Sequence, residues 1–387
     1  MHLLIDIFYN GIFGGIVLLW VVGSRRAYMG RVVTMLKRHL LVVSAIFWVV
    51  FLVFAFVFVT NFDYFERIHD IDDAVEGAVQ SYEDDINPYE EYVIPRFKTR
   101  YVPGVDWTLG PYNYLPVDLF IYAGYYEALG WIGSPMWFVV TNLIFSGIAF
   151  IVLREMLNSA WVVYLPLAGI VMLFYSFDNA SLTLLLMVLS MYVYTRTRWH
   201  PGAIAIILMA LATLTKIFAA IPLVILVLFE LQRSVRLRNW RTAAETIAAT
   251  AIGAAVAVLV MLPFGIQNVL DSAVFFHTSE ELRVGTSVGG TLLSEIAMGS
   301  EYYSMISGAI VFASLIVGMR MRSLNDRVLL TTSFFLLVSV KSSLAPLIIA
   351  GVFLMLRLKE LSAAREDGQQ SEPSPREATP EPLPDST

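Results

Sequence analysis

The chain has 387 residues, of which 57% are hydrophobic and 15% are charged, with a formal net charge of -6 and a mean hydropathy of +0.69. A soluble domain carries about 25% charged residues, so this composition excludes an ordinary soluble enzyme and indicates an integral membrane protein. The sequence contains no cysteine, which excludes disulfides and thiolate metal sites.

Long apolar runs recur along the sequence and predict about eleven transmembrane helices. A helix of about 20 apolar residues crosses the hydrocarbon layer, and shorter helices suffice where neighbours shelter them. The runs lack the two-residue alternation of a membrane β-barrel, so the expected fold class is an all-α polytopic membrane protein. The predicted spans are 3–23, 39–60, 135–153, 160–175, 179–195, 201–215, 217–232, 246–263, 303–319, 328–340 and 344–356.

Lysine and arginine set the expected orientation, because the cytoplasmic loops of membrane proteins are enriched in them. Most of the 26 basic residues fall in cytoplasmic segments if the N-terminus lies outside. Arg25 and Arg26 follow the first apolar run, which therefore reads as a retained span and not as a cleaved signal. We expect a multi-pass cell-membrane protein with a cytoplasmic C-terminus. The cytoplasmic loops are then 24–38, 196–200, 233–245 and 320–327, and the large outer segments are 61–134 and 264–302.

The sequence divides into three parts. Residues 1–38 hold the first span and a basic cytoplasmic loop, and residues 39–361 form the main membrane domain with its large outer loop at 61–134. Residues 362–387 are rich in proline, glutamate and serine and predict a disordered cytoplasmic tail. No internal repeat is evident, which argues against a transporter built from inverted repeats.

The first outer loop carries an acidic cluster, Asp70, Asp72 and Asp73, about ten residues after the second span. Three carboxylates this close repel one another, which raises the pKa of one of them or attracts a cation. Their functional interpretation is a general base or a carboxylate that orients an acceptor group. The alternative is an ordinary solvated acidic loop.

The rest of this loop predicts a turn and a helix. The tripeptide Asn87-Pro88-Tyr89 is a turn signal. Residues 114–131 are apolar and aromatic but keep Asp118 and Glu127, so we expect a helix lying in the outer interface of the membrane. A twelfth crossing is the alternative, and it would reverse the arginine pattern.

Two lysines interrupt apolar sequence, Lys216 and Lys341, each at the outer end of a predicted helical hairpin. An ionisable residue at membrane depth is costly and by default indicates function. The alternatives are snorkelling to the interface and a salt bridge to a loop carboxylate. The later outer loop adds His277 and Arg283 in a segment rich in glycine and hydroxyl groups. Cations there could hold a phosphate while a carboxylate takes a proton from a hydroxyl.

Taken together, these motifs resemble those of the GT-C superfamily of polyprenol-phosphate-dependent membrane glycosyltransferases. The pattern is most similar to that of the phosphatidylinositol mannosyltransferase-like family, glycosyltransferase family 87. The resemblance covers roughly residues 39–357, and the span at 3–23 is an addition to the family pattern. The residues that carry it are Asp70-Ile71-Asp72-Asp73-Ala74, Asn87-Pro88-Tyr89, Tyr114-Leu115-Pro116, Lys216, His277 and Arg283.

The resemblance implies transfer of a sugar, mannose or another hexose, from a polyprenyl-phosphate donor to an acceptor hydroxyl at the outer membrane face, with inversion. Asp70, Asp72 or Asp73 would then be the catalytic base. Substrate binding would involve Lys216, His277, Arg283, Lys341, Tyr89 and Tyr114. No resident metal is assigned, although Asp70 and Asp72 have a spacing that leaves use of a divalent cation open. The expected partners are the lipid donor, a lipid, glycan or protein-linked acceptor and membrane lipid, with no nucleic acid.

Two other functions remain open at this point. One is a transporter or flippase that uses Lys216 and Lys341 in its substrate path, and the other is an assembly subunit whose acidic loop binds a partner. The identity of the sugar, the acceptor, the base among the three aspartates and the oligomeric state are not determined by these motifs.

Overall fold

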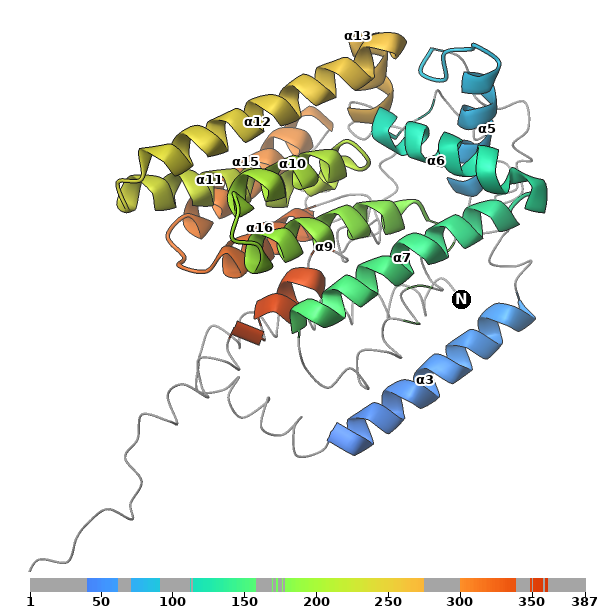
Figure 1. Cartoon of the computed structure of the whole chain (residues 1–387), viewed down its shortest axis with the longest axis horizontal. Helices are drawn as coiled ribbons and strands as arrows, with labels where there is room; N and C mark the ends of the chain where they lie inside the picture. The colour runs from blue at the N-terminus through green and yellow to red at the C-terminus, as the bar shows by residue number, and fades with distance from the viewer. Residues whose placement is uncertain are drawn as a thin grey trace, which may run out of the picture.

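The computed structural model is all-helical over the residues it describes, with no strand among them. The helices that carry the fold lie side by side, and the helices of the segment 71–129 lie across one end of them (Figure 1). The described residues are 40–61, 71–90, 112, 114–157, 169, 172, 176, 178–274, 300–338, 349, 351–357 and 359–360.

Five helices that follow one another along the chain form the centre of the bundle. Helix α9 packs against both α7 and α10, and α10 packs in turn against α11 and α12. The short connections along α9, α10, α11 and α12 make these helices run antiparallel in turn, and Figure 1 shows them side by side. Helix α7 runs parallel to α9, because Arg196 at the end of α9 donates to the Glu155 carbonyl near the end of α7. Their bounds are α7 Met136–Leu157, α9 Ala180–Arg196, α10 Pro201–Thr213, α11 Ala220–Arg236 and α12 Trp240–Met261.

Three segments are long and apolar enough to cross a membrane within the described part of the chain: Met136–Leu157, Ile217–Arg236 and Trp240–Phe264. Helices α9 and α10 are also apolar but shorter, and they are the most enclosed by their neighbours. Helix α3 (Leu40–Thr60) is apolar throughout, and most of its described side chains are exposed. Such a surface is stable in lipid and not in water. The chain is therefore a helical, membrane-embedded protein.

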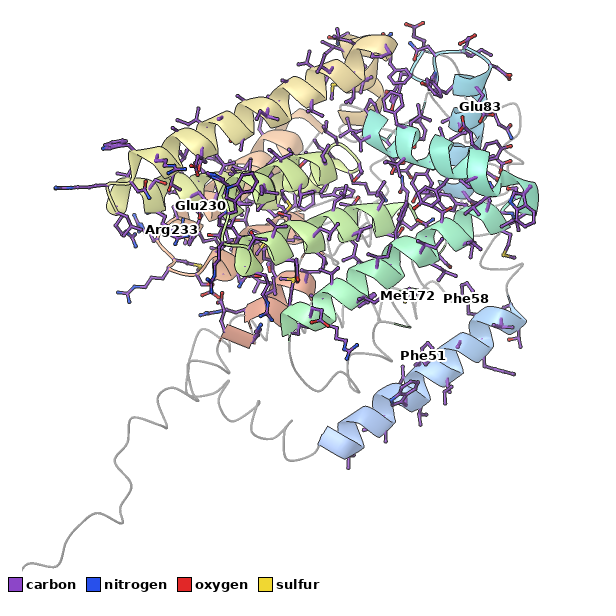
Figure 2. All side chains as sticks on the ribbon, viewed as in Figure 1. Phe51, Phe58, Glu83, Met172, Glu230 and Arg233 are labelled. Atoms are coloured by element: carbon purple, nitrogen blue, oxygen red, sulfur yellow. The ribbon has the colours of Figure 1, made fainter. Side chains whose placement is uncertain are left out.

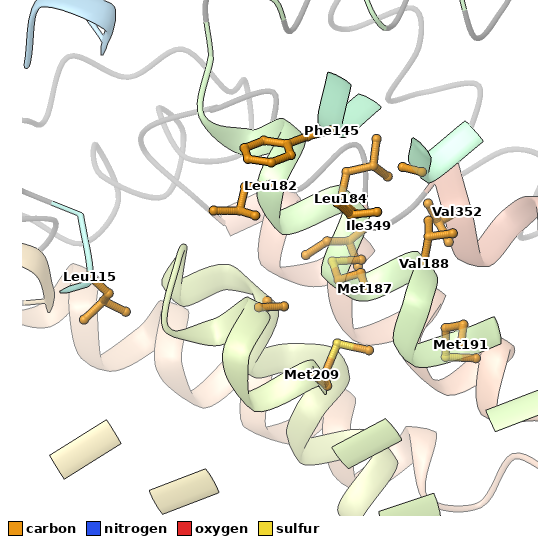
Figure 3. Packing of buried hydrophobic residues seen from close by; sticks show 14 of the residues in the cluster. Leu115, Phe145, Leu182, Leu184, Met187, Val188, Met191, Met209, Ile349 and Val352 are labelled. Carbon is orange, nitrogen blue, oxygen red and sulfur yellow. The ribbon is translucent and has the colours of Figure 1, made fainter. Parts of the chain in front are cut away.

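Two further helices of the bundle follow in the part of the chain after residue 299. Helix α15 (Ser300–Gly318) packs on α16 (Leu324–Val338), and α16 packs on α11. Figure 3 shows the interior, where Met187, Val188 and Met209 of α9 and α10 lie near Ile349 and Val352. These side chains are all buried and hold the late segments against the central helices.

Several predicted spans correspond closely to observed helices, and the helix of the predicted span 246–263 begins earlier than the span. Helix α12 begins at Trp240, so the predicted loop 233–245 shrinks to 237–239. Asn239 caps the helix by accepting the backbone N–H of Thr242, and Arg241 pairs with Glu245 one turn later at 3.0 Å. A cap and a pair of this spacing extend a helix into polar sequence, which hydropathy alone misses. The predicted spans 3–23 and 160–175 lie wholly or mostly outside the described residues, and about half of the span 344–356 does.

The long segment between α3 and α7 contains two described helices. Helix α5 (Ile71–Glu83) packs on α6 (Pro116–Leu129), and the 3-10 turn η1 (Gly130–Ile132) leads into α7. The helix predicted at 114–131 is thus confirmed as a helix. At 14 residues, α6 is about 21 Å long by its rise per residue, too short to cross a bilayer on its own.

The two ends of the bundle differ in composition. Helices α5, α6 and α13 (Ile266–Val269) gather at one end (Figure 1). Figure 2 places Glu83 at this end and Glu230 and Arg233 at the other. We call the first the loop end, and the second the arginine end, because the α9–α10 and α11–α12 turns there contain Arg198 and Arg238.

Candidate functional site

Lys216 occupies the turn between α10 and α11, as its position between two apolar runs predicts. Helix α10 ends at Thr213, and Lys216 has an extended backbone just before the 3-10 turn η2 (Ile217–Ala219). The hydroxyl of Thr215 donates to the Ala212 carbonyl at 2.7 Å and lies 2.7 Å from the Thr183 hydroxyl of α9. The turn is thereby fixed to the neighbouring helix, and the lysine has a defined position.

The Lys216 ammonium is buried and paired. Its Nζ lies 2.6 Å from Oδ1 of Asp178, and the residue is only 6% exposed. Nζ also lies 5.3 Å from the centre of the Tyr114 ring, a cation–π contact. The same Asp178 oxygen accepts the backbone N–H of Ala180 at 2.8 Å, at the start of α9. Burying this pair costs desolvation that the Coulomb attraction does not fully return, so its retention points to a specific role.

Asp118 of α6 is a second buried carboxyl group in the same neighbourhood. Its Oδ2 accepts the Tyr112 hydroxyl at 2.6 Å and the Asn179 side-chain amide at 2.8 Å, while its Oδ1 is buried without a hydrogen-bond partner among the described residues. Burial raises the pKa of Asp118 to about 7, against the opposing effect of its two hydrogen bonds and of nearby Lys216. This carboxyl group therefore exchanges its proton near neutral pH.

The dipeptide Asp178-Asn179 joins the two groups. Asp178 binds Lys216, and the next residue, Asn179, donates to Asp118. The turn that precedes α9 thus connects α6 to the turn between α10 and α11. A buried acid, a buried ion pair and an orphaned carboxylate oxygen consequently lie together at the loop end.

Aromatic residues of the segment between α5 and α6 enclose this cluster on one side. The Tyr89 hydroxyl donates to the Tyr114 carbonyl at 2.8 Å, and the Tyr112 ring lies 5.7 Å from Tyr89 and 5.4 Å from Tyr114. The turn predicted at Asn87 is present, and the Asn87 amide donates to the Phe264 carbonyl at the end of α12. Of the two tyrosines predicted to bind substrate, Tyr114 contacts Lys216 directly and Tyr89 is buried behind it.

A polar network next to the cluster holds α6 against α7 and α9. Asn142 of α7 accepts hydrogen bonds from the hydroxyls of Tyr122, at 2.5 Å, and of Ser181. Its amide nitrogen donates to the Ser176 carbonyl at 3.4 Å. All four side chains are fully buried, and satisfied buried networks make a site rigid.

The predicted base cluster lies in a helix and not in an irregular loop. Asp72 and Asp73 occupy the first turn of α5, where the helix dipole favours negative charge. Asp72 is buried and Asp73 is exposed. Among the described residues, the carboxylate that pairs with Lys216 is that of Asp178 and not that of Asp72 or Asp73. Asp70, His277, Arg283 and Lys341 lie outside the described residues.

Sequence reasoning missed Asp178 and Asn179, and noted Asp118 only as a polar residue in an apolar stretch. The signal was the polar interruption Ser176-Phe177-Asp178-Asn179 between two apolar runs. It marks the same end of the bundle as Lys216.

As for metals, no group of three or more histidine or acidic residues is placed to hold an ion in the part of the chain that the structure describes.

Comparisons with protein-family models, with curated proteins and with solved structures found no match. Function is therefore inferred from the residues themselves.

Proposed function

We propose that this chain is a membrane-embedded glycosyltransferase that moves a hexose from a polyprenyl-phosphate donor to an acceptor hydroxyl at the outer membrane face. The observation that carries the proposal is the buried Lys216, held by Asp178 against Tyr114 at the loop end of the bundle. The family resemblance of the surrounding motifs supports the same function. A transporter path is less well supported, because transporter sites lie near the midplane of the membrane and this cluster lies at one end.

The charges of the cluster suit a phosphate. The Lys216–Asp178 pair has no net charge, so an ionised Asp118 would make the cluster negative and would repel a phosphate. The pKa of Asp118 near 7 lets this group be neutral while a lipid phosphate approaches Lys216. Lys216 can then exchange Asp178 for a phosphate oxygen and gain a charge-assisted hydrogen bond.

The proposed reaction is an in-line displacement at the sugar. The acceptor hydroxyl oxygen attacks the anomeric carbon, the bond from that carbon to the phosphate oxygen breaks, and the lipid phosphate leaves with the electron pair. Lys216 stabilises the charge that develops on the leaving phosphate. An aspartate takes the hydroxyl proton as general base, and the resemblance assigns this role to Asp70, Asp72 or Asp73. Asp118 and Asp178 position the lysine.

The proposal includes the predicted topology. Eleven crossings with the N-terminus outside place the loop end at the outer face and the arginine end in the cytoplasm. The segments containing His277, Arg283 and Lys341 then lie on the same face as Lys216, where they would complete the phosphate site.

The test is transfer by the purified full-length protein in proteoliposomes. The donors are radiolabelled polyprenyl-phosphate mannose and glucose, and the acceptors are membrane lipids, glycans and peptides. Lys216→Met is expected to lower the transfer rate by about 10²-fold, in line with the loss of one donor to a developing anion. Lys216→Arg keeps a cation and is expected to retain part of the activity.

Lys359→Met is the matched control, because Lys359 contacts the Met156 carbonyl near the C-terminal end of α7, away from the cluster. Single asparagine variants of Asp70, Asp72 and Asp73 identify the base, whose loss costs about 10²-fold or more. Full transfer by Lys216→Met would contradict the phosphate role. Movement of labelled donor across the vesicle membrane without transfer to any acceptor would instead establish a flippase.

A further inference from the structure

A pocket opens at the arginine end of the bundle, far from the Lys216 cluster. It has a volume of about 440 Å³ and lies between the α9–α10 turn, the end of α11 and the start of α12. Nothing in the proposed transfer reaction uses it. The charged side chains that line it are those of Arg198, Arg233, Arg241, Glu230 and Glu245, joined by His200.

Both glutamates in the pocket already have partners. Glu230 is almost completely buried and accepts the Tyr194 hydroxyl at 2.6 Å and Nη1 of Arg233 at 3.4 Å. Glu245 lies 3.0 Å from Nε of Arg241 and 3.0 Å from Nδ1 of His200. Each carboxylate thus fixes one arginine at the pocket wall.

The arginines retain donors for another ligand. A guanidinium carries five N–H donors, and the recorded ion pairs of Arg233 and Arg241 use one nitrogen each. Arg198 has no ion-pair partner among the described residues. Three guanidinium groups against two carboxylates leave the pocket positive, and the guanidinium fork matches phosphate oxygens in pairs.

Two residues in the turns around the pocket have a left-handed backbone. His200 and Arg238 have φ angles of 44° and 52°, in the left-handed region that favours glycine. They lie in the two turns that border the pocket, α9–α10 and α11–α12. At Arg238 this is the cap that ends α11, because the Asn239 N–H donates to the Ser234 carbonyl at 2.9 Å and the Arg238 N–H to the Val235 carbonyl at 3.2 Å. The pocket wall is also closely packed at Gly202, because a Cβ there would come within 3.1 Å of the Glu230 carboxylate.

Two exposed tryptophans mark the level of this pocket in the membrane. Trp199, in the pocket wall, is 74% exposed, and Trp240, at the start of α12, is 71% exposed. Exposed tryptophans concentrate at the headgroup level of a bilayer, where the ring is partly apolar and its N–H stays hydrated. The pocket therefore lies where phospholipid headgroups lie.

We propose that this pocket binds the phosphate headgroup of an anionic membrane phospholipid. Its volume is in the range of small-molecule sites, and its three arginines and flanking tryptophans match a phosphate attached to acyl chains. Basic pockets between transmembrane helices bind anionic headgroups on the cytoplasmic side in the same way. A free phosphate presents the same kind of oxygen atoms but has no acyl chains, so it gains nothing from a position at the membrane interface.

The test is ligand binding to the full-length protein in a mild uncharged detergent. Binding is measured by intrinsic tryptophan fluorescence and by native mass spectrometry. The three probes are dihexanoyl phosphatidylglycerol, dihexanoyl phosphatidylcholine and inorganic phosphate. We expect phosphatidylglycerol to bind at least about tenfold more tightly than the other two. Replacing Arg198, Arg233 or Arg241 by glutamine should weaken phosphatidylglycerol binding about fivefold in each case. This is the contribution of one basic residue near a charged membrane surface.

Arg236→Gln is the matched control, because Arg236 is a neighbouring arginine outside the pocket lining. Arg198→Gln is the variant least able to disturb folding, since Arg198 is exposed and makes no ion pair with a described residue. Equal binding of phosphatidylglycerol to wild type and Arg198→Gln would overturn the proposal. Equal affinity for inorganic phosphate and phosphatidylglycerol would overturn the lipid as the ligand. Each outcome is independent of glycosyl transfer.

Discussion

At the residue scale, the buried acid Asp118 is the group whose chemistry the structure changes most. Its carboxyl group receives two hydrogen bonds on one oxygen and none from a described residue on the other. Burial favours the neutral acid, which can itself donate a hydrogen bond, and raises its pKa from 3.8 to about 7. Neither the position of Asp118 in an apolar stretch nor its neighbours in sequence reveal this.

The first prediction concerns stability against pH. The folded state keeps the Asp118 proton up to about pH 7, whereas the unfolded chain releases it near 3.8. The stabilising effect is therefore complete below about pH 4 and is lost as the pH rises to about 7. A shift of this size corresponds to a change on the order of 4 kcal/mol, an upper bound.

Asp118→Asn removes this titration while it keeps an acceptor for Tyr112 and Asn179. We expect the variant to gain stability relative to wild type as the pH rises from 5 to about 7, measured by thermal unfolding in detergent. Glu127→Gln is the control, because Glu127 is an exposed acid on the same helix. Parallel pH curves for wild type and Asp118→Asn would refute the raised pKa.

At the element scale, close contact between α10 and α12 depends on small residues. A Cβ on Gly253 of α12 would lie 2.8 Å from the Cβ of Ala210 on α10. Small residues let transmembrane helices approach closely, and that packing replaces the hydrophobic effect inside a bilayer. Because α10 also carries the Lys216 turn at its end, this contact supports the candidate site.

The second prediction tests this contact. Gly253→Ala should destabilise the protein by about 1–3 kcal/mol, as overpacking does, and Gly253→Leu should destabilise it more. Gly308→Ala on α15 is the matched control, because a Cβ there meets nothing within 4 Å. That variant should be neutral or more stable, since alanine is the better helix former. Unfolding in mixed micelles measures both, and equal stabilities would contradict close packing of α10 on α12.

At the scale of the whole molecule, the bundle has two chemically different ends. Figure 2 places Glu83 at the loop end and Arg233 at the arginine end. The loop end holds the buried Lys216 cluster, and the arginine end holds the basic pocket. A donor at one face and a regulatory or structural lipid at the other would thus bind to separate sites.

The third prediction concerns orientation, and the chain contains no cysteine to interfere. Single cysteines at Glu83 and at Arg238 should label differently with an impermeant thiol reagent in sealed cells. We expect position 83 to react from outside and position 238 to react only after permeabilisation, because cytoplasmic loops are enriched in arginine. Labelling of position 238 in sealed cells would reverse the topology and remove the outer-face site from the proposed function.

The sequence by itself determined the class of structure and the main helices. Apolar runs without alternation require helices in lipid, so α7, α10 and α11 lie close to their predicted places. The turn at Asn87 and the position of Lys216 at a hairpin also follow from sequence, because proline and a lysine at membrane depth each have few stable positions.

Only the tertiary structure decided which groups meet. Lys216 pairs with Asp178 and lies near Asp118, residues about 40 and 100 positions away in the chain, and no local rule of propensity or hydropathy relates them. The start of α12 depended on a cap and an ion pair, which hydropathy does not register. Hydrophobic patterning sets the path of each helix, whereas side-chain pairing between helices depends on packing angles and depth, which are properties of the assembled bundle.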